Sequence, residues 1–135
     1  ITPVSLEELF RTSDIITCHT ALTWETHHIV SAERLATMKP TAVLINTSRG
    51  PVVDETALID ALRSGTIAGA GIDVFEKEPV DPDNPLLTMD NVTVTPHMAG
   101  TTYNTWFRRS EFAYGNMKRV WEGQPPLAVA RDYEG

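Results

Sequence analysis

The chain has 135 residues, of which 41% are hydrophobic and 21% charged, and this is the composition of one globular domain with one core. Its net charge of −7 disfavours non-specific binding to nucleic acid or anionic lipid, because both need clustered Lys and Arg. Its apolar runs are far shorter than the ~20 residues that span a bilayer, and its single cysteine excludes an internal disulfide. We therefore expect a cytoplasmic protein that binds small molecules, with neither nucleic acid nor membrane as a partner.

The first predicted elements are a short helix and a strand. Ser5-Leu-Glu-Glu8 has the pattern of a capping box and predicts a helix that runs to about Arg11. Residues 14–19 are apolar and β-branched in their middle, which predicts a strand covered on both faces. Cys18 lies in this run, and we interpret it as a small buried side chain without a redox role.

A second strand follows after a loop and a helix. Residues 21–30 have no clear period and indicate a loop, whereas residues 31–38 predict a helix that Pro40 ends. Residues 42–46 then form another continuous apolar run. The order strand, helix, strand is typical of a parallel crossover.

The same alternation continues along the chain. Asp54 can cap a helix whose apolar positions follow a 3.6-residue period, and Gly65 stands where a glycine would end that helix. Residues 68–74 predict a third strand and residues 92–95 a fourth. Helices that alternate with parallel strands predict an α/β fold, the second half of a doubly wound, Rossmann-like parallel sheet.

Two further features bear on domain organisation. Residues 103–122 mix aromatic and charged side chains at helical spacing, which predicts a long C-terminal helix that leaves the sheet domain. The only G-x-G pattern, Gly69-Ala-Gly71, lies within a predicted strand and lacks the third glycine of a phosphate-binding loop. We therefore expect the pyrophosphate of any dinucleotide to bind outside this chain.

Polar side chains follow every predicted strand. In open α/β sheets, ligands bind beyond the carboxyl ends of the strands, so these residues are expected to form one rim of a cleft. In chain order they are His19 and Thr20, then Asn46, Thr47, Ser48 and Arg49, then Asp73 and Glu78, and finally Pro96 and His97.

Arg49 is a candidate anion-binding residue. Gly50 and Pro51 follow it and end the strand, so its planar guanidinium is held at a turn where it could bind a carboxylate with two hydrogen bonds. An isolated arginine would more simply be a surface side chain. Its place among small polar residues after a buried strand favours a function.

His97 and Glu78 form a candidate acid–base pair. Histidine, with an ordinary pKa of roughly 6.5, suits proton transfer near neutral pH, and an adjacent carboxylate favours its charged form. Glu78 precedes His97 by 19 residues, at the mouth of the preceding strand. The simpler alternatives are a structural histidine and a solvated loop acid.

Other chemistries fit the sequence less well. His27 and His28 are adjacent, so their side chains diverge, and no other ligand has suitable spacing; we expect both to be solvated and predict no metal site. Ser48 with His97 and an acid would suggest a serine hydrolase. The sequence around Ser48 is not the G-x-S-x-G elbow that exposes a nucleophilic serine, which makes a hydrolase a poor second.

Several motifs in order resemble the D-isomer-specific 2-hydroxyacid dehydrogenases over nearly the whole chain. They are Asn46-Thr-Ser-Arg-Gly50, Val53-Asp54, Ala57-Leu58, Gly71-Ile-Asp-Val-Phe75, Glu78-Pro79, Asn91-Val92, Thr95-Pro-His97 and Gly100-Thr-Thr102. The resemblance implies an oxidoreductase in which His97 exchanges a proton with the substrate oxygen, Glu78 keeps His97 charged, and Arg49 binds the substrate carboxylate.

The resemblance also implies a nicotinamide cofactor, NAD, with NADP as the open alternative. It places Asp73 at the carboxamide, Thr47 and Ser48 against the nicotinamide ribose, Ala99 and Gly100 beside the ring, and Thr20 and Ala21 on the adenosine side. Arg49 and His97 are expected to contact the cofactor as well. The family usually has proline at the position of Ala21, and this departure concerns only the shape of that loop.

Two relatives of this family represent other functions. Formate dehydrogenase resembles the chain around His97 but has glutamine where Glu78 stands, so the glutamate favours the 2-hydroxyacid reaction. The C-terminal-binding corepressors resemble the family and keep a similar arginine, glutamate and histidine. A dinucleotide-sensing protein without catalytic activity is therefore the alternative function.

The resemblance implies that the chain is a fragment. Residues 1–100 correspond to the C-terminal half of the dinucleotide-binding domain, and residues 101–135 to an interdomain helix and tail that return towards a substrate domain. The phosphate loop and the acid that separates NAD from NADP would lie upstream of Ile1. We expect the fragment to be inactive alone, and the full-length protein to be a homodimer.

Overall fold

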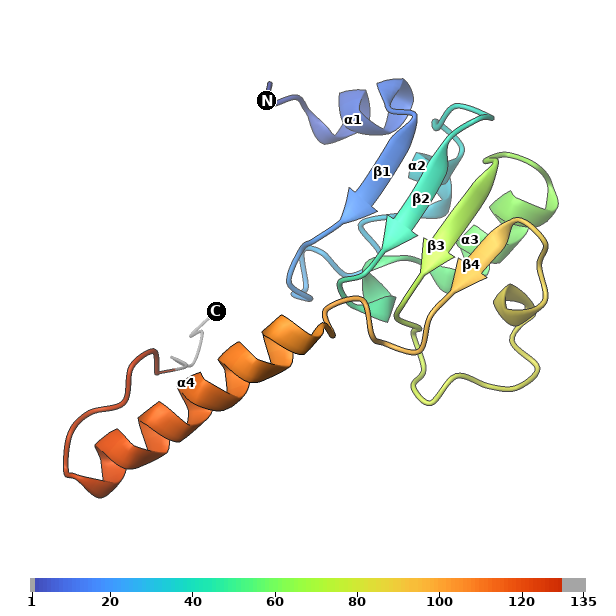
Figure 1. Ribbon diagram of the computed structural model, residues 1–135. Coiled ribbons are helices and arrows are strands. Elements are labelled where there is room, and N and C mark those ends of the chain that lie inside the picture. Colours follow the sequence, from blue (N-terminus) through green and yellow to red (C-terminus); the bar gives the residue numbers. More distant parts are fainter. Residues whose placement is uncertain (1, 130–135) are drawn as a thin grey trace. The chain divides into compact units, whose positions relative to one another are not determined.

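The structure is a computed structural model that describes residues 2–129. The chain divides between Ala99 and Gly100 into two compact units, and each is described by itself. The first unit holds a parallel sheet with its helices, and the second holds one long helix (Figure 1).

The sheet has four parallel strands in the order β1-β2-β3-β4. The strands are β1 (Ile15–Cys18), β2 (Val43–Asn46), β3 (Gly69–Ile72) and β4 (Val92–Val94). Because each strand follows its neighbour in sequence, the connections are successive crossovers on a sheet that grows in one direction. This arrangement confirms the predicted α/β, Rossmann-like fold.

Helices or short helical turns occupy the connections. Helix α1 (Leu6–Thr12) precedes β1, α2 (Ala32–Leu35) links β1 to β2, and α3 (Glu55–Arg63) links β2 to β3. Two 3₁₀ turns lie at Gly50–Val52 and Pro85–Leu87.

The predicted caps form at the helix ends. The Ser5 hydroxyl accepts the N–H of Glu8 at 3.2 Å, and the Asp54 carboxylate accepts that of Ala57 at 2.9 Å. Gly65, with a φ of 71°, follows the last turn of α3, where a left-handed residue is needed. Local sequence therefore sets where these helices begin and end.

The hydrophobic core lies between the sheet and its helices, with α2 and α3 behind the sheet in Figure 1. One row of the sheet pairs Ile16 with Leu44, Leu44 with Ala70, and Ala70 with Val92, and the first three of these side chains are buried. Burial raises the pKa of the Cys18 thiol to about 11, so this cysteine is an inert core side chain at neutral pH.

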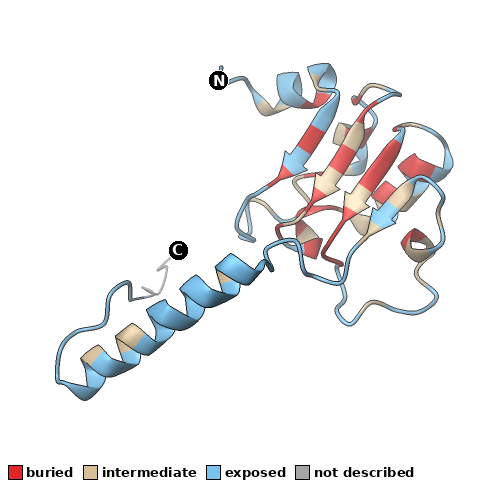
Figure 2. Ribbon diagram, in the orientation of Figure 1, coloured by how far each residue is buried: buried red, intermediate tan, exposed pale blue. Residues whose placement is uncertain are grey.

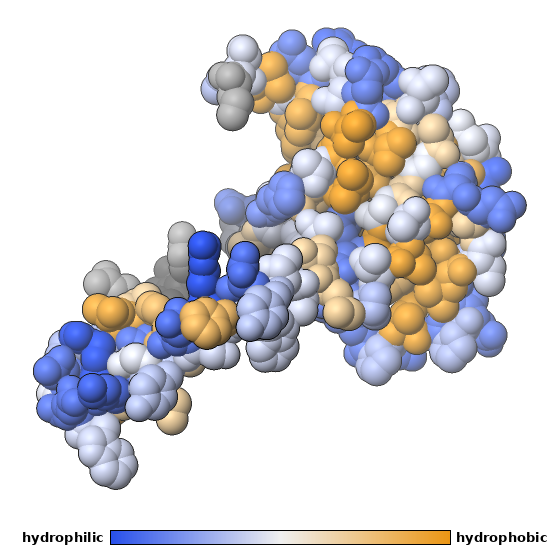
Figure 3. All heavy atoms as spheres, in the orientation of Figure 1, coloured by the Kyte–Doolittle hydropathy of each residue, from blue (hydrophilic) through white to orange (hydrophobic). Residues whose placement is uncertain are grey.

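The prediction that the first strand is covered on both faces is wrong for the described residues. In β1, Ile16 and Cys18 are buried, whereas Ile15 is 63% exposed and Thr17 is exposed as well (Figure 2). The cause is that α2 and α3 cover only one face of the sheet. Figure 3 shows hydrophobic side chains gathered on the face that they leave open.

The second unit is built around α4 (Tyr103–Trp121), close to the predicted bounds. The Thr102 hydroxyl caps its first turn, and none of its residues is buried; Trp106 and Phe107, for example, are 65% and 58% exposed. The predicted tail extends to residue 135, and residues 130–135 lie outside the described part of the chain. Within residues 2–129, no helix combines the length and apolar character that crossing a bilayer requires.

Candidate active site

The turn after β2 is held by a buried side chain. Asn46, 1% exposed, donates from Nδ2 to the carbonyl oxygen of Arg49 at 3.0 Å. Its Oδ1 accepts the backbone N–H of Ser48 at 3.1 Å and the Ser48 hydroxyl at 2.9 Å. Asn46 thus forms hydrogen bonds with the backbone at both ends of the turn and fixes the position from which the Arg49 side chain extends.

The guanidinium of Arg49 retains donors for a ligand. Its Nη1 donates to the carbonyl oxygen of Ser48 at 2.7 Å, which steadies the side chain. Among residues 2–129, no carboxylate lies within ion-pair distance of it. The residue is exposed, and its remaining N–H groups can form the paired hydrogen bonds that a carboxylate accepts.

Asp73, at the end of β3, holds the turn that carries His97. Its carboxylate accepts the Thr95 hydroxyl and the backbone N–H groups of Met98 at 2.7 Å and Ala99 at 3.0 Å. Its carbonyl oxygen accepts the N–H of His97 at 2.8 Å. Burial of Asp73 opposes ionisation, but these hydrogen bonds and the nearby His97 outweigh burial and lower the pKa of the carboxyl group.

The Asp73 contacts keep His97 in an unusual backbone conformation. His97 has a φ of 53°, in the left-handed region that a non-glycine residue seldom adopts. Hydrogen bonds on both sides of the residue hold it there. The surrounding hydrogen bonds, rather than the backbone preference of histidine, therefore set the position from which the imidazole extends.

His97 and Glu78, the two residues of the predicted acid–base pair, are in contact. His97 Nδ1 lies 2.8 Å from Glu78 Oε2, and Glu78 Oε1 accepts the backbone N–H of Phe75 at 3.1 Å. The hydrogen bond from His97 is the main reason that the pKa of Glu78 is lowered; burial opposes it and the Phe75 N–H adds to it. With Nδ1 bound to Glu78, Nε2 is the ring nitrogen left for a substrate.

Two hollows in the first unit contain most of the predicted site residues. One, of about 240 Å³, is lined by Asp73, Phe75, Glu78, Pro79, Val80, Pro96 and His97. The other, of about 460 Å³, is lined by His19, Thr20, Ala21, Leu22, Thr47, Ser48 and Arg49. The larger volume is within the roughly 300–1,000 Å³ of small-molecule sites, and the smaller one is just below that range. Ala99 lies next to the first hollow through its bond to Asp73, whereas Gly100 belongs to the second unit.

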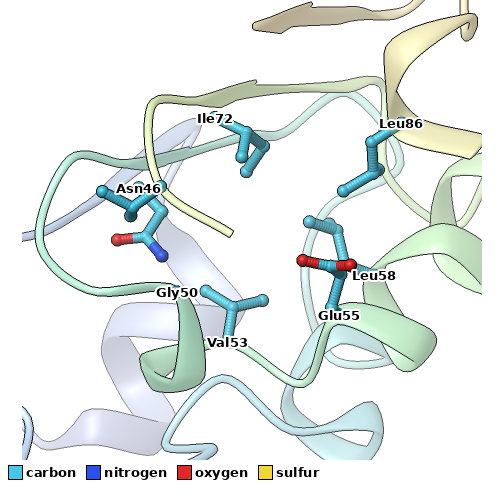
Figure 4. A pocket seen from close by; sticks show the side chains of 8 residues that line it. Asn46, Gly50, Val53, Glu55, Leu58, Ile72 and Leu86 are labelled. Carbon is cyan, nitrogen blue, oxygen red and sulfur yellow. The ribbon is translucent and has the colours of Figure 1, made fainter. Parts of the chain in front are cut away.

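A third cavity is too small to hold a substrate or a cofactor. It has about 10 Å³ of free volume, close to the space of one water molecule. Figure 4 shows its lining side chains, from Asn46 at the end of β2 to Leu86 across the core. This cavity belongs to the packing beneath the site.

The expectation that both histidines of the 21–30 loop are solvated is wrong for His28. His27 is exposed, but His28 Nε2 lies 2.7 Å from Glu76 Oε1, an acid 48 residues later in the sequence. Sequence reasoning also gave no positioning role to Asn46 or Thr95. A short polar residue at the end of an apolar strand was the available signal for Asn46, whereas nothing local indicates the partner of His28.

Comparison with known proteins shows the family of the chain. The model of the NAD binding domain of D-isomer specific 2-hydroxyacid dehydrogenases matches residues 1–99, and the chain belongs to this family. A glyoxylate reductase of Thermofilum pendens is 49% identical over 124 residues, which are 92% of this chain and 37% of that protein. The chain thus spans less than half the length of such relatives.

Solved structures of the same family are similar to the chain. A D-isomer specific 2-hydroxyacid dehydrogenase from Xanthobacter autotrophicus Py2, in complex with NADPH and MES, is 44% identical with a TM-score of 0.76 and covers 94% of this chain and 42% of its own. The NAD complexed enzyme from Lactobacillus delbrueckii ssp. bulgaricus is 30% identical with a TM-score of 0.86, covering 96% and 43%.

Proposed function

We propose that the intact protein transfers hydride between NAD(H) or NADP(H) and a D-2-hydroxy acid/2-oxo acid pair. The observation that carries this proposal is the 2.8 Å contact between His97 and Glu78, at the same edge of the sheet as the Arg49 guanidinium. The named activity of the Thermofilum relative makes glyoxylate the first substrate to test.

The residues present fit a nicotinamide dinucleotide on one side of the site. The hollow lined by Thr20, Ala21, Thr47 and Ser48 offers hydroxyl groups that suit a dinucleotide, with Thr47 and Ser48 towards the nicotinamide ribose and Thr20 and Ala21 towards the adenosine. When bound, the nicotinamide supplies or accepts the hydride. Asp73, Ala99 and Gly100 are proposed to border the ring, as the family resemblance implies.

His97 is the proposed proton donor in the reductive direction. Its Nδ1–H is held by the Glu78 carboxylate, so Nε2 gives its proton to the substrate carbonyl oxygen and recovers it in the reverse direction. Glu78, kept ionised by its lowered pKa, stabilises the imidazolium. Both groups act near the hollow that they line together.

Arg49 is the proposed substrate anchor. Its free N–H groups bind the carboxylate of the 2-oxo acid and stabilise the negative charge that develops on the neighbouring oxygen. Binding the carboxylate in two places also orients the carbonyl carbon for hydride transfer.

We also propose the domain organisation that the resemblance implies. Residues 1–100 form the C-terminal half of the dinucleotide-binding domain, and residues 101–135 return towards a substrate domain supplied by further sequence. A homodimer in the cytoplasm, without nucleic acid or membrane as a partner, stays a prediction. The purified 135 residues should bind dinucleotide weakly and show no turnover; dehydrogenase activity from them alone would contradict this.

The test is oxidation of NADH by the intact protein with glyoxylate, hydroxypyruvate or pyruvate. Turnover is expected with at least one of them and should be lost in His97→Ala, whereas Glu25→Ala, which removes an exposed loop side chain, should leave it unchanged. Absence of turnover on every 2-oxo acid, combined with tight NADH binding, would favour the dinucleotide-sensing alternative.

A further inference from the structure

His28 connects two segments that carry site residues. Its backbone N–H donates to the carbonyl oxygen of Pro51 at 2.8 Å, two residues after Arg49. Its Nε2 lies 2.7 Å from Glu76 Oε1, two residues before Glu78. One residue of the 21–30 loop therefore contacts both the Arg49 turn and the Glu78 loop.

Glu76 is also bound to the start of α3. Its Oε1 accepts the N–H of Glu55 at 3.2 Å, and its own N–H donates to Glu55 Oε2 at 3.0 Å. Asn84 Nδ2 in turn donates to Glu55 Oε1 at 2.7 Å. The two bonds with Glu55 fix Glu76 through its backbone and its side chain, and Asn84 in turn holds the Glu55 carboxylate.

The two site segments also touch directly. A Cβ atom placed on Gly50 would lie 1.8 Å from the carbonyl oxygen of Phe75 and 2.5 Å from the nitrogen of Glu76. The N–H of Phe75 holds Glu78 Oε1 at 3.1 Å. A shift of the Phe75–Glu76 peptide would therefore move Glu78 and press on the turn that carries Arg49.

We propose that His28 and Glu76 are positioning residues that set the placement of Arg49 relative to the Glu78–His97 pair. This inference rests on the proposed function. The side chains of His28 and Glu76 are 36% and 35% exposed, and a pair so accessible to water adds little to the stability of a protein. Its removal should consequently affect catalysis more than folding.

The variants are chosen to separate geometry from strain. His28 has a φ of 52°, which asparagine tolerates better than alanine, so His28→Asn keeps the backbone bond to Pro51 and loses the reach to Glu76. Glu76→Ala removes every side-chain contact, whereas Glu76→Gln keeps an oxygen that can accept from His28 and Glu55. Lys77→Ala, a neighbour whose side chain is 80% exposed, is the control.

In the intact protein, His28→Asn and Glu76→Ala should each lower kcat about tenfold or more and raise KM for the 2-oxo acid, because small displacements of reacting groups are costly. KM for NADH and the unfolding midpoint should change little. Glu76→Gln should recover most of the activity, and Lys77→Ala should match wild type. The double variant should lose no more than the worse single variant, since the two residues act as one contact.

Hydrogen exchange provides a readout that does not need turnover. Amides of residues 47–50, 52 and 74–78 should exchange faster in His28→Asn and Glu76→Ala than in wild type. If wild type has no activity, the proposed function fails. The exchange rates would still show whether the contact between His28 and Glu76 holds the two segments in place. Wild-type kinetics in both variants, independent losses in the double variant, or unchanged exchange would overturn the proposal.

Discussion

The Nδ1 atom of His97 lies 2.8 Å from Oε2 of Glu78, and the other carboxylate oxygen of Glu78 accepts the backbone N–H of Phe75. The imidazole is therefore oriented by a carboxylate that is itself anchored to the backbone. In the proposed reaction, this double anchoring leaves Nε2 as the nitrogen for proton transfer and makes the charge of Glu78 part of the acid–base pair.

Replacing Glu78 with glutamine should separate charge from position. Glu78→Gln keeps a hydrogen-bond acceptor for His97 but removes the negative charge that stabilises the imidazolium, so kcat for 2-oxo acid reduction should fall by at least about tenfold. Steady-state kinetics with NADH and glyoxylate measure the loss. Glu25→Gln, at an exposed loop position, is the control, and equal rates for the two variants would remove Glu78 from the mechanism.

The lowered pKa of Glu78 predicts a pH dependence of stability. A carboxyl group whose pKa is lower in the folded protein stabilises it above the unfolded pKa, about 4.3 for Glu, and loses that contribution as pH falls through the folded value. The difference in unfolding midpoint between wild type and Glu78→Gln should be present at pH 5 and shrink as the pH falls below about 4. Denaturant unfolding over this range measures it, and a difference that grows on acidification would contradict the assignment.

Arg49 should be sensitive to a change of shape at constant charge. Arg49→Lys keeps the positive charge but loses the planar fork, so KM for the 2-oxo acid should rise about tenfold to a hundredfold. The same replacement at Arg63, exposed at the end of α3, should have no effect. An unchanged KM in Arg49→Lys would mean that the substrate carboxylate binds elsewhere.

Local patterns predicted most of the fold but not all of the site. Caps such as Ser5 and Asp54 and the apolar period of each segment gave the elements, because these signals depend on neighbouring residues. The strand ends identified Arg49, Glu78 and His97, since parallel strands deliver their carboxyl ends to one edge. The contact between His28 and Glu76 depends on tertiary packing across 48 residues, which no periodicity records.

The open face of the sheet shows a related limit. A continuous apolar run predicts burial on both sides, yet Ile15 is 63% exposed in the described part of the chain. The apolar run of β1 is typical of a strand buried on both faces. The helices that cover this sheet within residues 2–129 reach only one face.

Asp73 should contribute to stability as well as to the site. Asp73→Asn leaves one acceptor oxygen where two now serve Thr95, Met98 and Ala99, so a backbone N–H of the His97 turn loses its partner at a cost of about 1–3 kcal/mol. The free energy of unfolding should fall by that amount and kcat should fall with it. Asp60→Asn, exposed on α3, is the matched control. Wild-type stability in Asp73→Asn would show that the turn holds without these bonds.

Gly50 is the position where a single methyl group should be most disruptive. A Cβ atom there would overlap the carbonyl oxygen of Phe75, and neither backbone segment can move without disturbing the Arg49 turn or the Glu78 loop. Gly50→Ala should therefore lower the free energy of unfolding by about 3 kcal/mol or more. Gly115→Ala offers the opposite case, because a Cβ on that residue of α4 meets nothing within 4 Å and alanine favours helix by up to ~1 kcal/mol. Thermal unfolding of the two variants compares them directly, and a tolerated Gly50→Ala would mean that the two site segments are not in contact in solution.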